Sequence, residues 1–180
     1  MFVIHGSSRQ NGNTEALTHT MIDGIIETEQ IYLQDHTIHP ITDQRHDAEG
    51  FQPVHDDYEQ LIERMLEHDT IIFATPLYWY GMSGHMKNFV DRWSQSLRDT
   101  SLHFKEKMKD KKMYVVIVGG DNPKLKALPL IAQFQYIFDF VGSSFEGYII
   151  GDANGLDEIK NDAEALAKAQ FYNIEFKNSK

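Results

Sequence analysis

The chain has 180 residues, a formal net charge of −10 at pH 7 and no cysteine. Its length and its 41% of hydrophobic residues predict one globular domain spanning residues 1–180. The negative charge argues against nucleic acid or an anionic membrane as a partner, and the lack of cysteine excludes disulfides, thiolate nucleophiles, and zinc or iron–sulfur sites held by cysteine.

Apolar strand-like runs and amphipathic helical segments alternate along the chain. The most strand-like run is YVVIVGG at 114–120, and the helical segments carry apolar residues four positions apart, as at Leu17 and Met21. A long, polar, His-rich connection at 35–57 interrupts the alternation. In chain order, we predict a strand at 2–4, a helix at 17–25, a strand at 31–33, a helix at 56–66, a strand at 70–76, a helix at 86–97, a strand at 114–120, a helix at 130–141, a strand at 145–150 and a helix at 156–171.

The alternation of strands and helices predicts a parallel sheet that helices bury on both faces. For this chain length we predict a flavodoxin-like, three-layer α/β/α fold whose five-stranded parallel sheet has the order 2-1-3-4-5. In doubly wound sheets, ligands bind beyond the carboxyl ends of the strands, where the strand order reverses. We therefore expect the functional residues in the loops after strands 1, 3 and 4.

The loop after the first strand, GSSRQNGNT at 6–14, has the composition of an anion site. Gly6 and Gly12 allow a tight turn, Arg9 adds a positive charge, and the nearest carboxylate, Glu15, follows the loop. The first N–H groups of a helix lack internal partners and attract anions. Neutral hydrogen-bonding side chains come from Ser7, Ser8, Asn13 and Thr14. These features predict a phosphate site, although the same residues also fill simple strand–helix turns.

Several familiar phosphate loops do not fit this segment. A Walker loop needs a lysine where Asn13 stands, and the Rossmann pattern needs a glycine where Ser8 stands. A phosphatase loop needs cysteine, and IHGSS lacks the acids of a receiver domain. A terminal phosphate monoester is the ligand that fits best.

The loop after the third strand, TPLYWYGMSGHMKNF at 75–89, contains three consecutive aromatic residues. Tyr78, Trp79 and Tyr80 cannot all point inward, so they suit stacking on a flat ligand, packing against a neighbouring subunit, or both. For the charged residues on the following helix we expect ion-pairing or surface roles; they are Lys87, Asp91 and Arg92.

The loop after the fourth strand begins with Gly119 and Gly120. Adjacent glycines let backbone N–H groups approach the edge of a planar ring, where they would stabilise negative charge on a reduced flavin. A glycine pair also simply ends many strands, so the pair carries weight only together with the other two loops.

The three loops together resemble the NAD(P)H-dependent FMN reductase family of flavodoxin-like proteins. GSSRQNGNT at 6–14 resembles that family's GSxRxxGNT motif for the FMN phosphate, and the segment at 75–93 resembles its TPxYWxxxxxxxKxFxDR stretch. VGG at 118–120 resembles its third flavin loop. The resemblance implies the following FMN-binding residues: Ser7, Ser8, Arg9, Gly12, Asn13, Thr14, Pro76, Leu77, Tyr78, Trp79, Tyr80, Gly119 and Gly120.

The branch that the chain resembles most comprises iron–sulfur flavoproteins, whose cluster cysteines lie in the connection after strand 2. The corresponding segment here, at 36–51, has no cysteine, so the cluster is not carried over. Its histidines and aspartates make a metal site conceivable, but their spacing matches no metal motif, and we expect none. We expect a solvated or subunit-contacting loop instead.

The resemblance implies an FMN-containing oxidoreductase with NAD(P)H as co-substrate. Hydride would pass from the nicotinamide to the bound flavin and on to a small-molecule acceptor, which is a flavin, a quinone, or an azo or nitro compound. No catalytic side chain is assigned, because the cofactor carries the redox chemistry. We expect a cytoplasmic homo-oligomer, either a dimer or a tetramer. The alternatives are a flavodoxin-type electron carrier without its own substrate turnover and a regulatory FMN-binding module.

Overall fold

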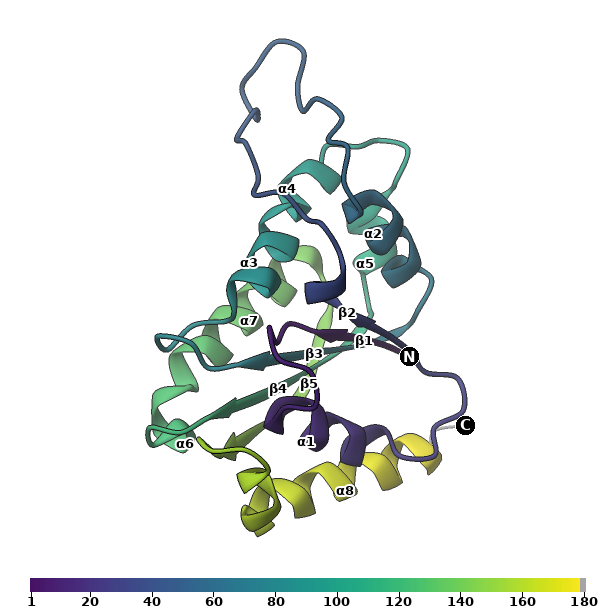
Figure 1. Cartoon of the computed structure of the whole chain (residues 1–180). Coiled ribbons are helices and arrows are strands. Elements are labelled where there is room, and N and C mark those ends of the chain that lie inside the picture. The colour runs from purple at the N-terminus through teal and green to yellow at the C-terminus, as the bar shows by residue number, and fades with distance from the viewer. Residues whose placement is uncertain (179–180) are drawn as a thin grey trace.

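The computed structural model describes residues 1–178, which contain five parallel strands in one sheet (Figure 1). The strands are β1 (Phe2–His5), β2 (Glu29–Tyr32), β3 (Thr70–Pro76), β4 (Lys112–Gly119) and β5 (Ser144–Asp152). Their order is β2-β1-β3-β4-β5, and each neighbouring pair is parallel. The predicted flavodoxin-like arrangement is therefore confirmed.

Helices cover both faces of this sheet. The α-helices are α1 (Asn13–Ile22), α2 (Tyr58–Leu66), α3 (Gly84–Asp91), α4 (Trp93–Ser96), α5 (Phe104–Met108), α6 (Pro123–Lys126), α7 (Leu128–Val141) and α8 (Ala163–Asn178). Two short 3₁₀ helices are η1 (Leu33–Asp35) and η2 (Glu158–Asn161). Figure 1 shows α1 and α8 on one face, with α2, α3, α5 and α7 on the other. None of these helices is long and apolar enough to cross a membrane.

The apolar core is split into two clusters by the sheet. Successive strand residues point to opposite faces, so Phe73 joins the cluster beneath α3 and α7 while Ala74 joins the one beneath α1 and α8. Phe73 packs against Phe134 and Phe138 with ring centroids 5.7 and 5.2 Å apart. Burial on both faces explains why the strands are continuously apolar in sequence.

Backbone hydrogen bonds continue past the strands and hold four loops side by side. Gly6 N–H donates to the carbonyl of Ala74 at 2.8 Å, which joins the loop after β1 to β3. Leu77 N–H donates to Val118 at 2.8 Å, and Ala153 N–H donates to Gly119 at 2.8 Å. The segments after β1, β3, β4 and β5 therefore meet at one edge of the sheet.

Several predicted helix bounds differ from the structure. The helix expected at 17–25 is α1, which runs from Asn13 to Ile22, and the helix expected at 86–97 is divided into α3 and α4. The helix expected from residue 56 begins at Tyr58, whose N–H donates to Asp56 Oδ1 at 3.1 Å, while Asp56 Oδ2 binds Arg92 at 2.7 Å. The last helix was expected to start at residue 156, but α8 begins at Ala163.

Candidate functional site

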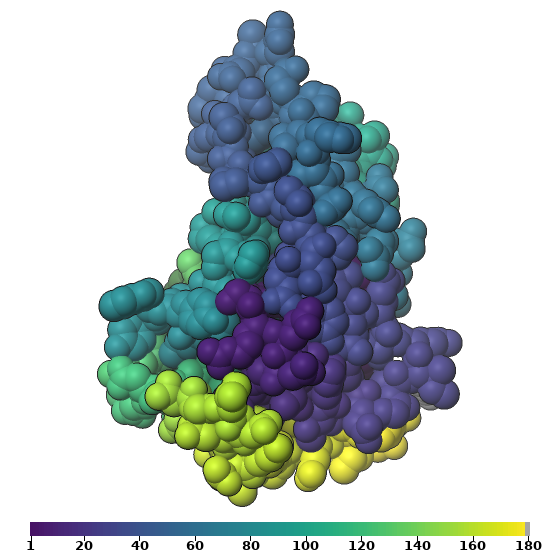
Figure 2. Space-filling view, in the orientation of Figure 1, coloured from purple at the N-terminus to yellow at the C-terminus, as the bar shows by residue number. Residues whose placement is uncertain are grey.

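A cavity of about 260 Å³ opens at the carboxyl ends of the strands. It is lined by Ser7, Arg9, Gly12, Asn13, Thr14, Pro76, Leu77, Tyr78, Val118, Gly119, Gly120, Ala153 and Asn154. Ten of these residues are among those the sequence analysis named, so loops far apart in the chain converge here. Figure 2 shows the loop after β1, in purple, beside the segment after β5, in lime.

The loop after β1 leaves the N-terminus of α1 open. Ser7 Oγ accepts from Arg9 N–H and donates to the Arg9 carbonyl, both at 3.0 Å, which folds the loop on itself. Gly12 precedes the helix in an extended conformation and offers no side chain to cap it, and no other side chain of the described residues does so. The first N–H groups of α1 are therefore available to a ligand in the cavity.

The Glu15 carboxylate is held by partners within the protein. It accepts Asn11 N–H at 2.6 Å and the Tyr32 hydroxyl at 3.0 Å, and the residue is buried. Burial, together with this hydrogen bond, raises the pKa of Tyr32 to about 12, so the hydroxyl remains a donor at neutral pH. Glu15 thus ties the loop to β2 with its negative charge already hydrogen-bonded.

Asn13 uses its side chain differently from the sequence expectation. Its Nδ2 donates to the Gly155 carbonyl at 2.7 Å, and its Oδ1 accepts Ile159 N–H at 3.3 Å. Both ends of the amide therefore bind the segment after β5. Asn13 still lines the cavity, but the donor that sequence reasoning assigned to a phosphate is engaged elsewhere.

The three aromatic residues after β3 form a tight turn. Tyr78 and Gly81 exchange backbone hydrogen bonds of 3.0 and 2.9 Å, and the two residues between them, Trp79 and Tyr80, have φ values of 48° and 63°. Such a turn favours Asn-Gly, and a left-handed conformation costs other residues about 1–2 kcal/mol each. Trp79 lies at the tip of this turn and is 97% exposed. Strain of this kind is typical of functional segments.

Trp79 and Tyr80 line a second hollow, of about 330 Å³, rather than the first cavity. Its lining residues are Leu77, Trp79, Tyr80, Gly120, Asp121 and Asn154. The Tyr80 hydroxyl donates to Asp121 Oδ2 at 2.8 Å, and Lys126 Nζ lies 2.6 Å from the same oxygen. Hydrogen bonds from Lys126 and Tyr80 lower the pKa of Asp121, which keeps the carboxylate charged and the turn attached to the loop after β4.

Ser8 is the last of the predicted FMN-binding residues, and it lies at the rim of the cavity. It does not line the cavity, but its hydroxyl lies 3.5 Å from that of Tyr78. This contact links the loop after β1 to the loop after β3.

The glycines after β4 allow other protein segments to approach. A Cβ at Gly119 would lie 3.0 Å from the Leu77 Cβ, and a Cβ at Gly120 would lie 2.5 Å from the Asn154 Cβ. The second distance is closer than real Cβ contacts, so Asn154 requires a glycine at position 120. The glycine pair was expected to leave this space for a ligand, whereas Asn154 occupies part of it.

Three lining residues are not among the predicted FMN-binding residues, namely Val118, which begins the VGG segment at 118–120, Ala153 and Asn154. Ala153 and Asn154 follow β5. The loop after this strand was not among those expected to bind a ligand, because the strand order does not reverse there. The signal was present in GDANG at 151–155, where small residues and an asparagine end a strand.

The charged residues after the aromatic turn form ion pairs, as predicted. Lys87 Nζ lies 2.5 Å from Asp91 Oδ1, and the buried Arg92 binds the buried Asp56 carboxylate. Within residues 1–178, no three His, Cys, Asp or Glu side chains come together as a metal site, and this includes the His-rich connection.

Comparison with known proteins identifies relatives over almost the whole chain. The model of the NADPH-dependent FMN reductase family matches residues 1–135. YwqN of Bacillus subtilis, named as an NAD(P)H-dependent FMN-containing oxidoreductase, is 52% identical over 168 residues, which are 93% of this chain and 92% of that protein. An iron–sulfur flavoprotein of Methanocaldococcus jannaschii is 38% identical over 100 residues, which are 53% of this chain and 51% of that protein. The solved structure of the Trp repressor binding protein from Bacillus subtilis superposes with a TM-score of 0.79 at 45% identity, covering 94% of both chains.

Proposed function

The chain belongs to the NADPH-dependent FMN reductase family, and on that premise we propose that it binds FMN in the 260 Å³ cavity at the carboxyl edge of its sheet. As a member of this family it is an NAD(P)H-dependent oxidoreductase that uses FMN. The observation that carries the placement is the uncapped N-terminus of α1, which faces the cavity beside Arg9.

In this proposal, the phosphate of FMN lies at the loop after β1. Backbone N–H groups at the start of α1 and the Arg9 guanidinium would bind its oxygens, with the hydroxyls of Ser7, Ser8 and Thr14 nearby. Gly12 keeps the helix end free of a competing side chain. Asn13 contributes its backbone N–H, because its side chain binds the segment after β5.

The isoalloxazine ring would lie against the loops after β3 and β4. Pro76, Leu77 and Tyr78 form one wall of the cavity, and Gly119 and Gly120 offer backbone groups to the edge of the ring. Bound FMN supplies the hydride acceptor and donor, and the surrounding residues bind it, orient it and limit access of water.

We further propose that the second hollow receives the electron acceptor. It shares Leu77, Gly120 and Asn154 with the cavity, so a ligand in it would adjoin the flavin. The exposed indole of Trp79 suits stacking on a flat ring, which flavins, quinones, and azo and nitro aromatic compounds all possess. An electron carrier without a substrate of its own would have no need of this hollow.

A homo-oligomer remains part of the proposal. An apolar groove of about 630 Å³ runs between α3 and α7, and the rings of Tyr136 and Phe140 at this groove are 72% and 62% exposed. Sedimentation of the purified protein, compared with a Phe140→Glu variant, tests it: the variant should shift towards the monomer. An unchanged sedimentation coefficient would mean that this groove is not a subunit contact.

The FMN site is tested by titrating the flavin-free protein with FMN and with riboflavin. The wild type should prefer FMN, and Arg9→Ala should weaken FMN binding about 10- to 100-fold because a hydrogen bond to a charged phosphate is lost. Riboflavin binding should not change. Arg45→Ala is the matched control, since Arg45 lies on the projecting connection and pairs with Asp43. Equal FMN affinities for the Arg9 and Arg45 variants would overturn this placement of the phosphate.

A further inference from the structure

The segment after β5 carries a polar side chain that the family motifs do not include. Asn154 lines both the cavity and the second hollow, and its side chain lies against Gly120. The backbone N–H of Asn154 donates to Glu158, but its side-chain amide makes no hydrogen bond with any of the described residues. An exposed amide beside the proposed ring site is therefore free to bind a ligand.

The conformation of this segment is fixed from within. The Glu158 carboxylate accepts the N–H groups of both Asn154 and Gly155, at 2.9 and 2.7 Å. These two donors lower the pKa of Glu158, which remains charged and keeps the turn closed at neutral pH. Asp162 anchors the far end, since it accepts Asp152 N–H at 2.8 Å and Ala165 N–H at 3.0 Å.

The segment is also fastened to the loop that we assign to the phosphate. Asn13 binds the Gly155 carbonyl and Ile159 N–H with the two ends of one amide. Gly155 directly follows Asn154, so the position of the Asn154 side chain depends on Asn13. The start of α1 and the edge of the ring site are thus connected by a single asparagine.

Resting on the proposed FMN site, we propose that Asn154 is a further flavin-contacting residue, whose side-chain amide hydrogen-bonds the polar edge of the isoalloxazine beside Gly120. Asn13 acts as its positioning residue. Reduction increases the electron density at that edge, so a donor there binds reduced flavin more tightly than oxidised flavin. Asn154 therefore raises the reduction potential of the bound cofactor.

The test measures dissociation constants for oxidised and reduced FMN under anaerobic conditions, together with the midpoint potential. In Asn154→Ala the dissociation constant for reduced FMN, divided by that for oxidised FMN, should rise about fivefold. The reason is that a neutral hydrogen bond that favours the reduced form is lost. Asn154→Asp should raise the ratio further, since it places a negative charge at the same edge. Asn161→Ala is the matched control, because Asn161 is exposed in η2 and lines neither space.

The role of Asn13 is tested by a double-mutant cycle. If Asn13 acts through Asn154, Asn13→Ala should raise the ratio of the reduced-FMN to the oxidised-FMN dissociation constant in the wild type. The same substitution should leave this ratio unchanged in the Asn154→Ala background. Equal effects in both backgrounds would overturn the positioning role.

Two outcomes separate this inference from the proposed function. A ratio in Asn154→Ala equal to that in Asn161→Ala, with FMN still bound tightly, would overturn the role of Asn154 alone. A wild-type protein that binds no FMN would overturn both. Urea unfolding of each flavin-free variant shows that a changed ratio does not come from a damaged fold.

Discussion

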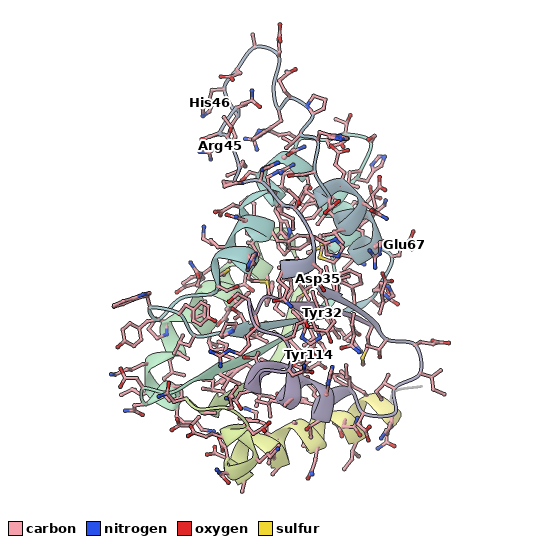
Figure 3. The ribbon with its side chains drawn as sticks, in the orientation of Figure 1. Tyr32, Asp35, Arg45, His46, Glu67 and Tyr114 are labelled. Carbon is pink, nitrogen blue, oxygen red and sulfur yellow. The ribbon has the colours of Figure 1, made fainter. Side chains whose placement is uncertain are left out.

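The loop after β1 and the connection after β2 leave neighbouring strands at the same edge of the sheet, but they use their polar groups in different ways. The loop after β1 is short, and it leaves the first N–H groups of α1 without a side-chain cap. The connection, at 36–57, extends away from the body, with Arg45 and His46 towards its far end (Figure 3). Three of its carboxylates, those of Asp43, Asp56 and Asp57, bind groups of the protein itself.

The connection is closed at its base by two aspartates. Asp57 accepts Thr37 N–H at 2.7 Å, and Asp56 accepts both His39 N–H at 2.9 Å and the Arg92 guanidinium. Arg92 also donates to the His39 carbonyl and lies over the Tyr58 ring, 4.5 Å from its centroid. The two segments therefore differ in what their polar groups already bind: the aspartates at the base of the connection are bonded within the protein, whereas the start of α1 has no side-chain cap. This difference is the reason why we propose the ligand site at the loop after β1.

The largest expected effect comes from breaking the base of the connection. Arg92→Ala should lower the free energy of unfolding by about 3–5 kcal/mol, because it leaves the buried Asp56 carboxylate without its cation. Urea denaturation of the flavin-free protein measures the change. Arg98→Ala is the control and should cost no more than about 0.5 kcal/mol, since Arg98 is exposed. Similar losses in both variants would mean that the base is not held by this pair.

The next largest effect is expected from placing a carboxylate at the uncapped start of α1. Gly12→Asp should stabilise the flavin-free protein by about 0.5 kcal/mol through helix capping, yet weaken FMN binding about 100-fold by repelling the phosphate. Gly12 has φ −84° and ψ 170°, so an aspartate fits without strain. FMN titration and urea denaturation together provide the check, with Gly12→Ser as the uncharged control. An FMN affinity equal to that of the serine variant would contradict the placement.

A smaller effect depends on pH and on a residue between the two segments. His5 directly precedes the loop after β1 and stacks on Tyr32 at the end of β2, with ring centroids 4.4 Å apart. Burial lowers the pKa of His5, so the unfolded chain binds a proton near pH 6.5 that the folded protein does not. Its contribution to stability is therefore complete above about pH 6.5 and is lost as the pH falls below it.

The corresponding variant is His5→Phe, which keeps an aromatic ring but removes the titrating group. Between pH 7 and pH 5, the wild type should lose more unfolding free energy than this variant does. Parallel pH profiles would mean that His5 does not contribute to the acid sensitivity.

The smallest expected effect comes from shortening the connection beyond its base. Replacing residues 42–53 by two glycines leaves both aspartates and Arg92 in place, so FMN affinity should change by less than about twofold. A titration with FMN measures this, and sedimentation reports any change in assembly. A large loss of FMN affinity would show that the far part of the connection reaches a flavin site.

The sheet order and most of the cavity could be predicted because they follow from local rules. Strands buried on both faces must be continuously apolar, and the carboxyl ends of parallel strands meet at one edge. The loop that we propose for the phosphate stands out in the sequence because glycines, neutral donors and an arginine precede a helix. None of these features depends on a particular distant partner.

The parts that sequence missed depend on specific partners or on unfavourable local geometry. Asn154 reaches the site because Gly120 leaves space for it, and Arg92 becomes buried because Asp56, 36 positions earlier, faces it. The left-handed turn at Trp79 and Tyr80 contradicts the residue preferences of such turns. Packing decides these contacts, so the sequence does not reveal them, even where GDANG at 151–155 marks the end of a strand.

The contrast between the two tryptophans of the chain has an optical consequence. Trp93 is buried in the core, whereas Trp79 is 97% exposed beside the second hollow. The fluorescence emission of Trp79 should therefore lie at longer wavelengths than that of Trp93, and iodide should quench the Trp79 emission selectively. A substrate that stacks on the indole would shield it from iodide, so the protein carries its own fluorescent reporter of acceptor binding.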